Sequence, residues 1–157
     1  MKIRHVERSE LPQLFELLQA KAVFDGCPET LRATVVTQEE AIFAERPLAH
    51  ALVAEIDGRL VGMATYYSIF SSFIAKPGIW LDDLYVDEAF RNQGIGEKLI
   101  QRLCMIAEGG GCARVDWHVS SFNARGVAFY RRIGASISEK SRHVRLGEDA
   151  IKELARR

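Results

Sequence analysis

The sequence predicts a mixed α/β fold, in which a central mixed sheet carries helices on both faces. Three observations lead to this prediction. Segments rich in β-branched and aromatic residues alternate with segments of helical periodicity. Asp57-Gly58, between two such β-rich runs, is typical of a tight hairpin. The stretch from Ile79 to Val119 reads as strand, helix, strand, with Gly109-Gly110-Gly111 ending the helix.

Composition limits the function classes. A chain of 157 residues and 17.6 kDa fits a single domain over 1–157. Its 21 basic and 21 acidic side chains balance, so we expect no nucleic acid and no membrane surface as partner. The first twenty residues contain no apolar run, which predicts a cytoplasmic protein without a signal peptide. The three cysteines have neither disulfide nor metal-ligand spacing, so we expect no metal.

The elements follow from local patterns. Pro12 and a leucine periodicity predict a first helix that begins behind Ser9 as its cap. Thr37 and Glu40 match a capping box for a second helix. In full, we expect strands at 2–6, 50–55, 59–69, 79–86, 113–119, 135–138 and 143–146, and helices at 9–24, 37–46, 93–108, 123–133 and the C-terminus, with a loop at 25–36.

The turn from Arg91 to Glu97, Arg-Asn-Gln-Gly-Ile-Gly-Glu, carries the first chemical signal. It lies between a predicted strand and a predicted helix. Glycines at 94 and 96 let backbone amides approach a ligand, and the first helical turn adds unsatisfied donors and the positive end of the dipole. Arg91 adds a charge that can bind a phosphate. The turn lacks the third glycine of a dinucleotide fingerprint and the Gly-Lys-Ser/Thr of a P-loop.

A second signal lies downstream. Asn123, Val127 and Tyr130 share one face of a predicted helix, so the asparagine and the phenol could meet one ligand. A single helical tyrosine is also a common core residue. Together the two segments resemble the GNAT acetyltransferase superfamily, whose signature is Arg/Gln-x-x-Gly-x-Gly/Ala followed by Asn and Phe-Tyr-x-x-x-Gly. Within it, the motifs at 80–86 and 129–135 are most similar to the diamine (spermidine/spermine) acetyltransferase subgroup.

The resemblance implies a mostly antiparallel twisted sheet, acetyl-CoA as cofactor, a small-molecule primary amine as substrate and a homodimer. The pantetheine arm would pair with the backbone of one strand, the pyrophosphate would lie on the glycine turn, and the downstream helix would touch the coenzyme further along. The implied cofactor-binding residues are Leu84, Tyr85, Val86, Arg91, Asn92, Gln93, Gly94, Ile95, Gly96, Glu97, Asn123, Gly126 and Tyr130.

Acetyl transfer requires a neutral amine and a protonated leaving thiol. An alkyl amine titrates near about 10.4 and a thiol near about 8.5, so both proton transfers help at neutral pH. Tyr130 is the candidate general acid at sulfur. Asp82 is the candidate group that accepts the amine proton, through water, and a backbone amide near Leu84 or Tyr85 would polarise the acetyl carbonyl.

The sequence departs from the diamine enzymes around the acceptor. Their Leu-Glu-Asp motif is Leu81-Asp82-Asp83 here, which shortens the proposed base by one methylene. Asp25, Asp82, Asp83 and Asp116 are the candidate substrate-binding carboxylates, and surface solvation is an equal interpretation for Asp25 and Asp116. We therefore expect a small amine such as a lysine analogue. Acetylation of protein lysines or N-termini, and non-catalytic acyl-CoA binding, remain alternatives.

Overall fold

The computed structural model describes all residues from 1 to 157. They form two compact units, residues 1–118 and residues 119–157, and each is described by itself. The first unit holds the sheet and most helices. None of the helices combines the length and the apolar character that a bilayer crossing requires.

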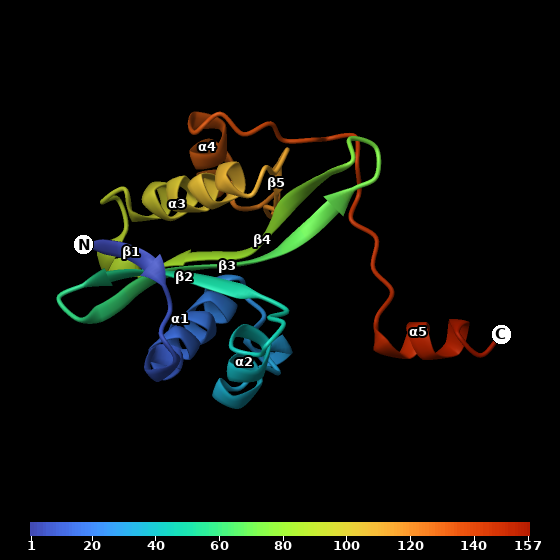
Figure 1. Cartoon of the computed structure of the whole chain (residues 1–157), viewed down its shortest axis with the longest axis horizontal. Helices are drawn as coiled ribbons and strands as arrows, with labels where there is room; N and C mark the ends of the chain where they lie inside the picture. The colour runs from blue at the N-terminus through green and yellow to red at the C-terminus, as the bar shows by residue number, and fades with distance from the viewer. The chain divides into compact units, whose positions relative to one another are not determined.

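The first unit contains one five-stranded sheet in the order β1-β2-β3-β4-β5. All neighbouring pairs are antiparallel except β4 and β5, which run parallel. Figure 1 shows α3 on one face of this sheet and α1 and α2 on the other, which confirms the predicted mixed fold. The strands are β1 (Lys2–His5), β2 (His50–Ile56), β3 (Arg59–Ser71), β4 (Lys76–Val86) and β5 (Val115–Asp116), and the helices are α1 (Leu11–Phe24), α2 (Val35–Ile42) and α3 (Ile95–Gly109).

The hairpin between β2 and β3 is confirmed. Asp57 and Gly58 both have positive φ, 50° and 78°, as a two-residue turn of the mirror-image type requires. A second hairpin, which the sequence analysis did not anticipate, joins β3 to β4 through residues 72–75, where Ala75 has φ of 48°. This hairpin extends β4 by three residues before the predicted start at Ile79.

Alternation along the strands divides the core into two layers. Leu14 of α1 packs with Val53 and Met63 on one face. On the other face, α3 approaches so closely that a Cβ on Gly62 would lie 3.4 Å from the side chains of Ile95 and Leu99. This close approach fixes the start of α3 against the centre of the sheet.

Two predicted caps are wrong. Ser9 does not cap α1, because residues 8–10 form a 3-10 turn, in which Glu7 and Glu10 satisfy each other's backbone amides. Thr37 does not begin α2. Thr34 accepts from the Thr37 amide, and the helix begins at Val35, inside the predicted loop. Thr34 thus caps α2 three residues before the predicted position, whereas α1 continues directly from the 3-10 turn and has no side-chain cap of its own.

The second unit contains α4 (Ala124–Arg132) and α5 (Glu148–Leu154). The cap at Asn123 is confirmed. The predicted strands at 135–138 and 143–146 are wrong, because the sheet consists of β1 to β5 only, and a strand forms where a neighbouring strand accepts its hydrogen bonds. For the same reason β5 is limited to the two residues that pair with β4.

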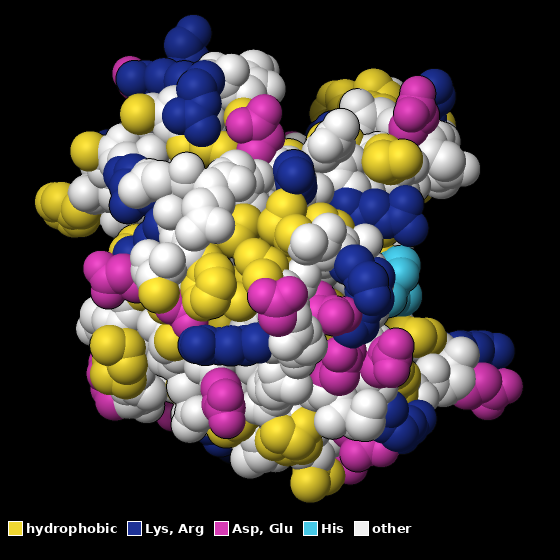
Figure 2. All heavy atoms as spheres, turned by 90° about the vertical axis from the view of Figure 1, so that its left-hand side faces the viewer, with side chains coloured by type: hydrophobic (Ala, Val, Ile, Leu, Met, Phe, Trp, Pro, Cys, Tyr) yellow, Lys and Arg dark blue, Asp and Glu magenta, His cyan; other side chains and the backbone are white.

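Charges of both signs are interspersed on the surface. Figure 2 shows Lys and Arg side chains among Asp and Glu side chains around apolar patches, so this face carries no large field of one sign. This distribution agrees with the balanced composition.

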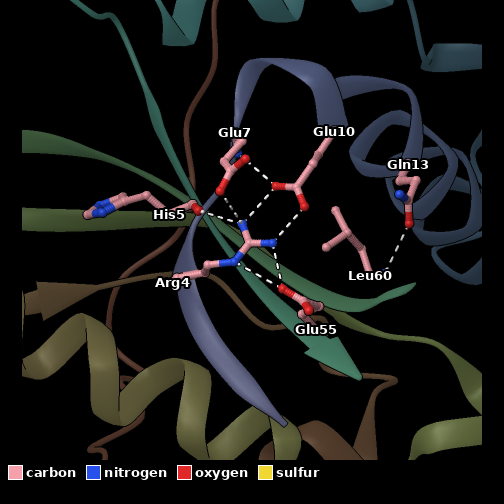
Figure 3. A network of polar contacts seen from close by, with 7 residues as sticks. All are labelled: Arg4, His5, Glu7, Glu10, Gln13, Glu55 and Leu60. Atoms are coloured by element: carbon pink, nitrogen blue, oxygen red, sulfur yellow. Dashed lines mark hydrogen bonds and ion pairs between the residues drawn. The ribbon is translucent and has the colours of Figure 1, made fainter. Parts of the chain in front are cut away.

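One ion-pair network joins β1, β2 and the start of α1 (Figure 3). The two terminal nitrogens of Arg4 donate to the two carboxylate oxygens of Glu10, at 2.7 and 2.6 Å. Its Nε and one terminal nitrogen also donate to Glu55, at 3.1 and 2.6 Å. The hydrogen bond from Arg4 lowers the pKa of the Glu10 carboxyl.

We expect Arg4→Met to lower the free energy of unfolding by about 1–3 kcal/mol at pH 7, because two partly buried carboxylates then lose their shared cation. The folded-state pKa of Glu10 is depressed, so its stabilisation is present above the unfolded pKa and is lost as pH falls through the folded pKa. Urea denaturation should therefore show a weaker dependence on acid pH in the variant. Lys152→Met, in an exposed pair with Glu148, is the control, with a change under about 0.5 kcal/mol. An unchanged pH dependence would contradict this role of Arg4.

Candidate active site

The pairing of β3 with β4 is interrupted at one residue. Thr65 lies opposite Asp83, but the next residue, Tyr66, lies opposite Leu81, so Asp82 is an extra residue on β4. Such a bulge breaks the ladder locally and re-aims the side chain at the bulged position. The candidate base therefore lies at an irregularity in the middle of the sheet.

Beyond the bulge, β4 has a strand partner on one side only. β5 pairs with β4 at Ile79 and Trp80 and extends no further along it. Leu84, Tyr85 and Val86 pair with β3 alone. Their outward backbone groups form a short strand edge, which is the feature an extended ligand needs for strand-like pairing.

The end of β4 leads into the glycine turn. Asn92 and Gly94 have positive φ, 66° and 74°, so the chain turns sharply just before α3 begins at Ile95. A Cβ at Gly94 would meet no atom within 4 Å, so glycine serves the backbone conformation there rather than a close contact. The first intrahelical bond runs from the Lys98 amide to Gly94 O, at 3.1 Å. The amides of Ile95, Gly96 and Glu97 therefore have no acceptor within the helix, and they are suited to bind an anion, as the sequence predicts.

Arg91 is partly engaged within the protein. Its Nε donates to the Val86 carbonyl at 3.0 Å, and its guanidinium lies over the rings of Phe24 and Tyr85, at 4.8 and 5.6 Å. The side chain thus fastens the glycine turn to the end of β4 and the end of α1. Its Nε is committed to this contact, and only its terminal nitrogens could reach a phosphate.

The face of the sheet that α1 covers holds an acidic cluster with a cation at its centre. Lys21 of α1 forms ion pairs with Asp25 and with Asp83, the latter at 3.1 Å. Asp83 also accepts from the Thr65 hydroxyl at 2.8 Å. Although burial opposes it, the two carboxylates raise the pKa of Lys21, so it remains an ammonium. Two predicted substrate carboxylates are therefore brought together, with half of their charge compensated.

Lys21 is not among the site residues predicted from the sequence. The Lys21–Asp25 pair could have been read from their spacing of four on a predicted helix. The contact with Asp83 depends on how α1 packs on β4. Asp116, another carboxylate in the predicted substrate set, lies on β5. It pairs with Arg114 at 2.7 Å and does not take part in the ion pairs of Lys21.

Aromatic residues lie close to Asp82. Tyr67 and Trp80 face each other across β3 and β4, with stacked rings 6.5 Å apart, and His118 meets the Trp80 ring edge-on at 4.7 Å. Burial first, and then the Asp82 carboxylate, raise the pKa of Tyr67. The Asp82 side chain therefore lies next to a partly exposed apolar surface that could hold the methylene chain of an amine.

In the second unit, Asn123 and Gly126 together form the N-terminal cap of α4. The side-chain oxygen of Asn123, Oδ1, accepts a hydrogen bond from the Gly126 backbone amide at 2.8 Å. A Cβ at position 126 would lie 2.6 Å from the Asn123 amide nitrogen, so this cap requires glycine. Tyr130 lies on α4, with its ring 5.2 Å from that of Phe129. Because Tyr130 and Asp82 belong to different units, their cooperation stays a prediction.

A cavity of about 230 Å³ lies between α1 and the ends of β3 and β4. Of the predicted site residues, only Tyr85 lines it. Its wall contains the Arg59–Asp87 ion pair, at 2.7 Å. The cavity is thus separate from Asp82 and from the glycine turn.

Comparison with known proteins agrees with this geometry. The model of the acetyltransferase (GNAT) family matches residues 11–135. Thialysine N-epsilon-acetyltransferase from Mus musculus is 33% identical, over 99% of this chain and 98% of its own. The spermidine/spermine N(1)-acetyltransferase-like protein 1 from Homo sapiens is 29% identical over 85% of this chain and 20% of its own. These relatives confirm the resemblance to the diamine acetyltransferase subgroup.

Solved structures share the fold. An integron cassette protein from the mobile metagenome of V. cholerae superimposes with a TM-score of 0.81 at 24% identity, over 99% of this chain and 98% of that one. Because the family model spans most of the chain and the mouse relative matches it almost from end to end, the chain belongs to the acetyltransferase (GNAT) family and is an N-acetyltransferase.

Proposed function

We propose that the protein transfers an acetyl group from acetyl-CoA to the side-chain amine of a lysine-like amino acid, by direct attack in a ternary complex. The bulge at Asp82 is the observation that carries this proposal. It places a carboxylate at the start of a strand edge that leads to the amides before α3.

The residues present fit acetyl-CoA. The edge at 84–86 offers backbone groups to a pantetheine arm, and the amides of residues 92–97 offer donors to a pyrophosphate. The terminal nitrogens of Arg91 would flank the pyrophosphate, and Asn123 and Gly126 would lie further along the coenzyme. When bound, acetyl-CoA supplies the thioester whose acyl carbon accepts the amine.

The protein's own side chains and backbone amides would transfer the protons and stabilise the charge that develops on the acetyl oxygen. The Asp82 carboxylate accepts the proton of the bound ammonium, through a water molecule, because an ammonium has no lone pair for attack. A backbone amide near Leu84 or Tyr85 donates to the acetyl oxygen as negative charge develops there. The Tyr130 hydroxyl would give its proton to the leaving sulfur as the C–S bond breaks, and the second proton lost by the attacking nitrogen would restore the phenol.

The acceptor proposal rests on charge and on the relatives' names. Asp25 and Asp83 share Lys21, so this cluster carries about one net negative charge rather than two. A long polycation therefore gains little electrostatic attraction from this cluster. A small amine depends on the cluster less, because one carboxylate and the apolar rings can hold it. Thialysine N-epsilon-acetyltransferases match the chain over nearly its whole length, which supports a lysine-like acceptor. The homodimer and the cytoplasmic location stay predictions.

Measuring thiol release with acetyl-CoA and a panel of amines tests this function. We expect turnover with lysine analogues and ornithine, and lower kcat/KM with spermidine, spermine and aminoglycosides. A preference for spermine, or for peptide amines, would reject the proposed acceptor. Binding of acetyl-CoA in calorimetry without thiol release from any amine would instead show a non-catalytic binder.

We expect Asp82→Asn to lower kcat/KM for a lysine analogue by about 10²–10⁴-fold and to flatten its rise toward alkaline pH, because the amine proton loses its acceptor. Steady-state rates from pH 6 to 10 measure this effect. Asp57→Asn, in the β2–β3 turn, is the matched control and should leave the rates unchanged. If Asp82→Asn kept the wild-type pH profile, another group would be the base.

Tyr130→Phe should reduce kcat by about 10²-fold or more while the Kd for acetyl-CoA stays within about twofold, because the variant loses a proton donor and keeps the ring. Rates and calorimetry on the same preparation separate the two effects. Tyr66→Phe removes a phenol outside the candidate site and serves as the control. An unchanged kcat in Tyr130→Phe would remove this hydroxyl from the acid role.

Lys21→Gln should shift specificity toward polycations, since it leaves Asp25 and Asp83 without their shared cation. We expect the ratio of kcat/KM for spermidine to that for a lysine analogue to rise by about tenfold, the effect of roughly 1.4 kcal/mol. Lys152→Gln, which removes the same charge from α5, should leave the ratio unchanged. A ratio that stays constant in Lys21→Gln, with the fold intact by circular dichroism, would exclude this electrostatic role.

A further inference from the structure

The ion pair between Arg114 and Asp116 has no role in the chemistry proposed above. The Nε of Arg114 lies 2.7 Å from one carboxylate oxygen of Asp116, and both side chains are partly exposed. This contact uses one nitrogen of the guanidinium and one oxygen of the carboxylate. The two terminal nitrogens of Arg114 and the second oxygen of Asp116 are therefore available to a ligand from solvent.

Strand register places this pair beside the aromatic rings on the α1 face of the sheet. Thr65 lies on that face, because its hydroxyl donates to the acidic cluster under α1. Alternation along β3 puts Tyr67 on the same face. Trp80 lies opposite Tyr67, and Asp116 lies opposite Trp80. The ion pair therefore continues the row of side chains that the two rings begin.

Gly78 makes room for Arg114 on β4. The Arg114 carbonyl accepts from the Ile79 amide at 3.1 Å, which holds the backbone of the arginine against the strand. A Cβ at Gly78 would lie 3.2 Å from that carbonyl oxygen and 3.3 Å from Arg114 Cγ, tighter than an ordinary contact. The stem of Arg114 thus packs on β4 while its charged end stays accessible.

The spacing between Asp82 and Asp116 matches the length of an amino acid. Asp82 lies two residues beyond Trp80 on β4, and Asp116 lies opposite Trp80 on the next strand. At about 3.3 Å per residue and about 4.8 Å between strands, the two backbone positions are about 8 Å apart. An extended lysine side chain spans about 6 Å from its amine to Cα, with bonds of about 1.5 Å. Its methylenes would then cross the Trp80 ring.

We propose that Arg114 and Asp116 bind the α-carboxylate and the α-ammonium of the acceptor, and so select a lysine-like amino acid over a diamine of the same length. This inference rests on the proposed function, which places the reacting amine at Asp82. The terminal nitrogens of Arg114 donate to the α-carboxylate, and the second oxygen of Asp116 accepts from the α-ammonium. A head group with one charge of each sign thus meets a pair of the opposite signs.

Calorimetric titration with three ligands tests this site, in saturating coenzyme A, which carries no acetyl group to transfer. The ligands are lysine, cadaverine, which is lysine without its carboxylate, and ε-aminocaproate, which is lysine without its α-amine. We expect the wild type to bind lysine most tightly. Arg114→Gln should raise the Kd for lysine and for ε-aminocaproate by about tenfold and should not weaken cadaverine. Asp116→Asn should raise the Kd for lysine and for cadaverine similarly and should not weaken ε-aminocaproate.

The crossed pattern separates contact with the ligand from a structural role, because a damaged fold would weaken all three ligands alike. Arg8→Gln, which removes an arginine from a similarly exposed pair with Glu39, is the matched control and should leave every Kd unchanged. Equal losses for the three ligands, unchanged affinities in both variants, or no binding of lysine to the wild type would overturn the inference.

Thiol release from acetyl-CoA, measured on the same proteins, separates this inference from the proposed function. The crossed pattern in Kd without thiol release from any amine would keep the head-group site and reject acetyl transfer to it. Turnover of lysine without the crossed pattern would reject the head-group site and leave the proposed function standing.

Discussion

The extra residue at Asp82 is the constraint on which the rest of the site depends. It changes the register between β3 and β4 by one position, so the strand pairs regularly on either side of a single irregular point. On one side of this point β4 still pairs with β5, and on the other side it has lost that partner. The bulge therefore combines a re-aimed carboxylate with a strand edge that ends at the amides before α3. The proposed acetyl transfer would use the carboxylate for the amine, the edge for the pantetheine arm and the amides for the pyrophosphate.

The two faces of the sheet treat charge in opposite ways. Under α1, Lys21 forms ion pairs with Asp25 and Asp83, and the Thr65 hydroxyl donates to Asp83. Negative charge next to the bulge is therefore partly neutralised. Under α3, the buried Nε of Arg102 lacks an acceptor. The arrangement under α1 favours recognition of a modest cationic acceptor.

Local signals were sufficient for part of this picture. The Asp57-Gly58 hairpin, the Asn123 cap and the glycine turn before α3 were predicted correctly, because each depends on a few neighbouring residues. The predicted caps of α1 and α2 were wrong, because Glu7 caps a 3-10 turn that precedes α1 and Thr34 caps α2. The bulge and the Lys21–Asp83 contact depend on strand register and on helix packing, which no local pattern encodes. Family resemblance indicates the cofactor, whereas the choice of acceptor depends on these tertiary contacts.

Hydrogen–deuterium exchange with and without acetyl-CoA tests the central claim most directly, because it reads the backbone amides that the coenzyme would engage. We expect saturating acetyl-CoA to slow exchange at residues 82–86 of β4 and at residues 92–97 before and within α3, with no change in β1. The amine substrate alone should leave residues 92–97 unaffected. Protection confined to other parts of the chain, with these two segments exchanging as in the free protein, would contradict the account.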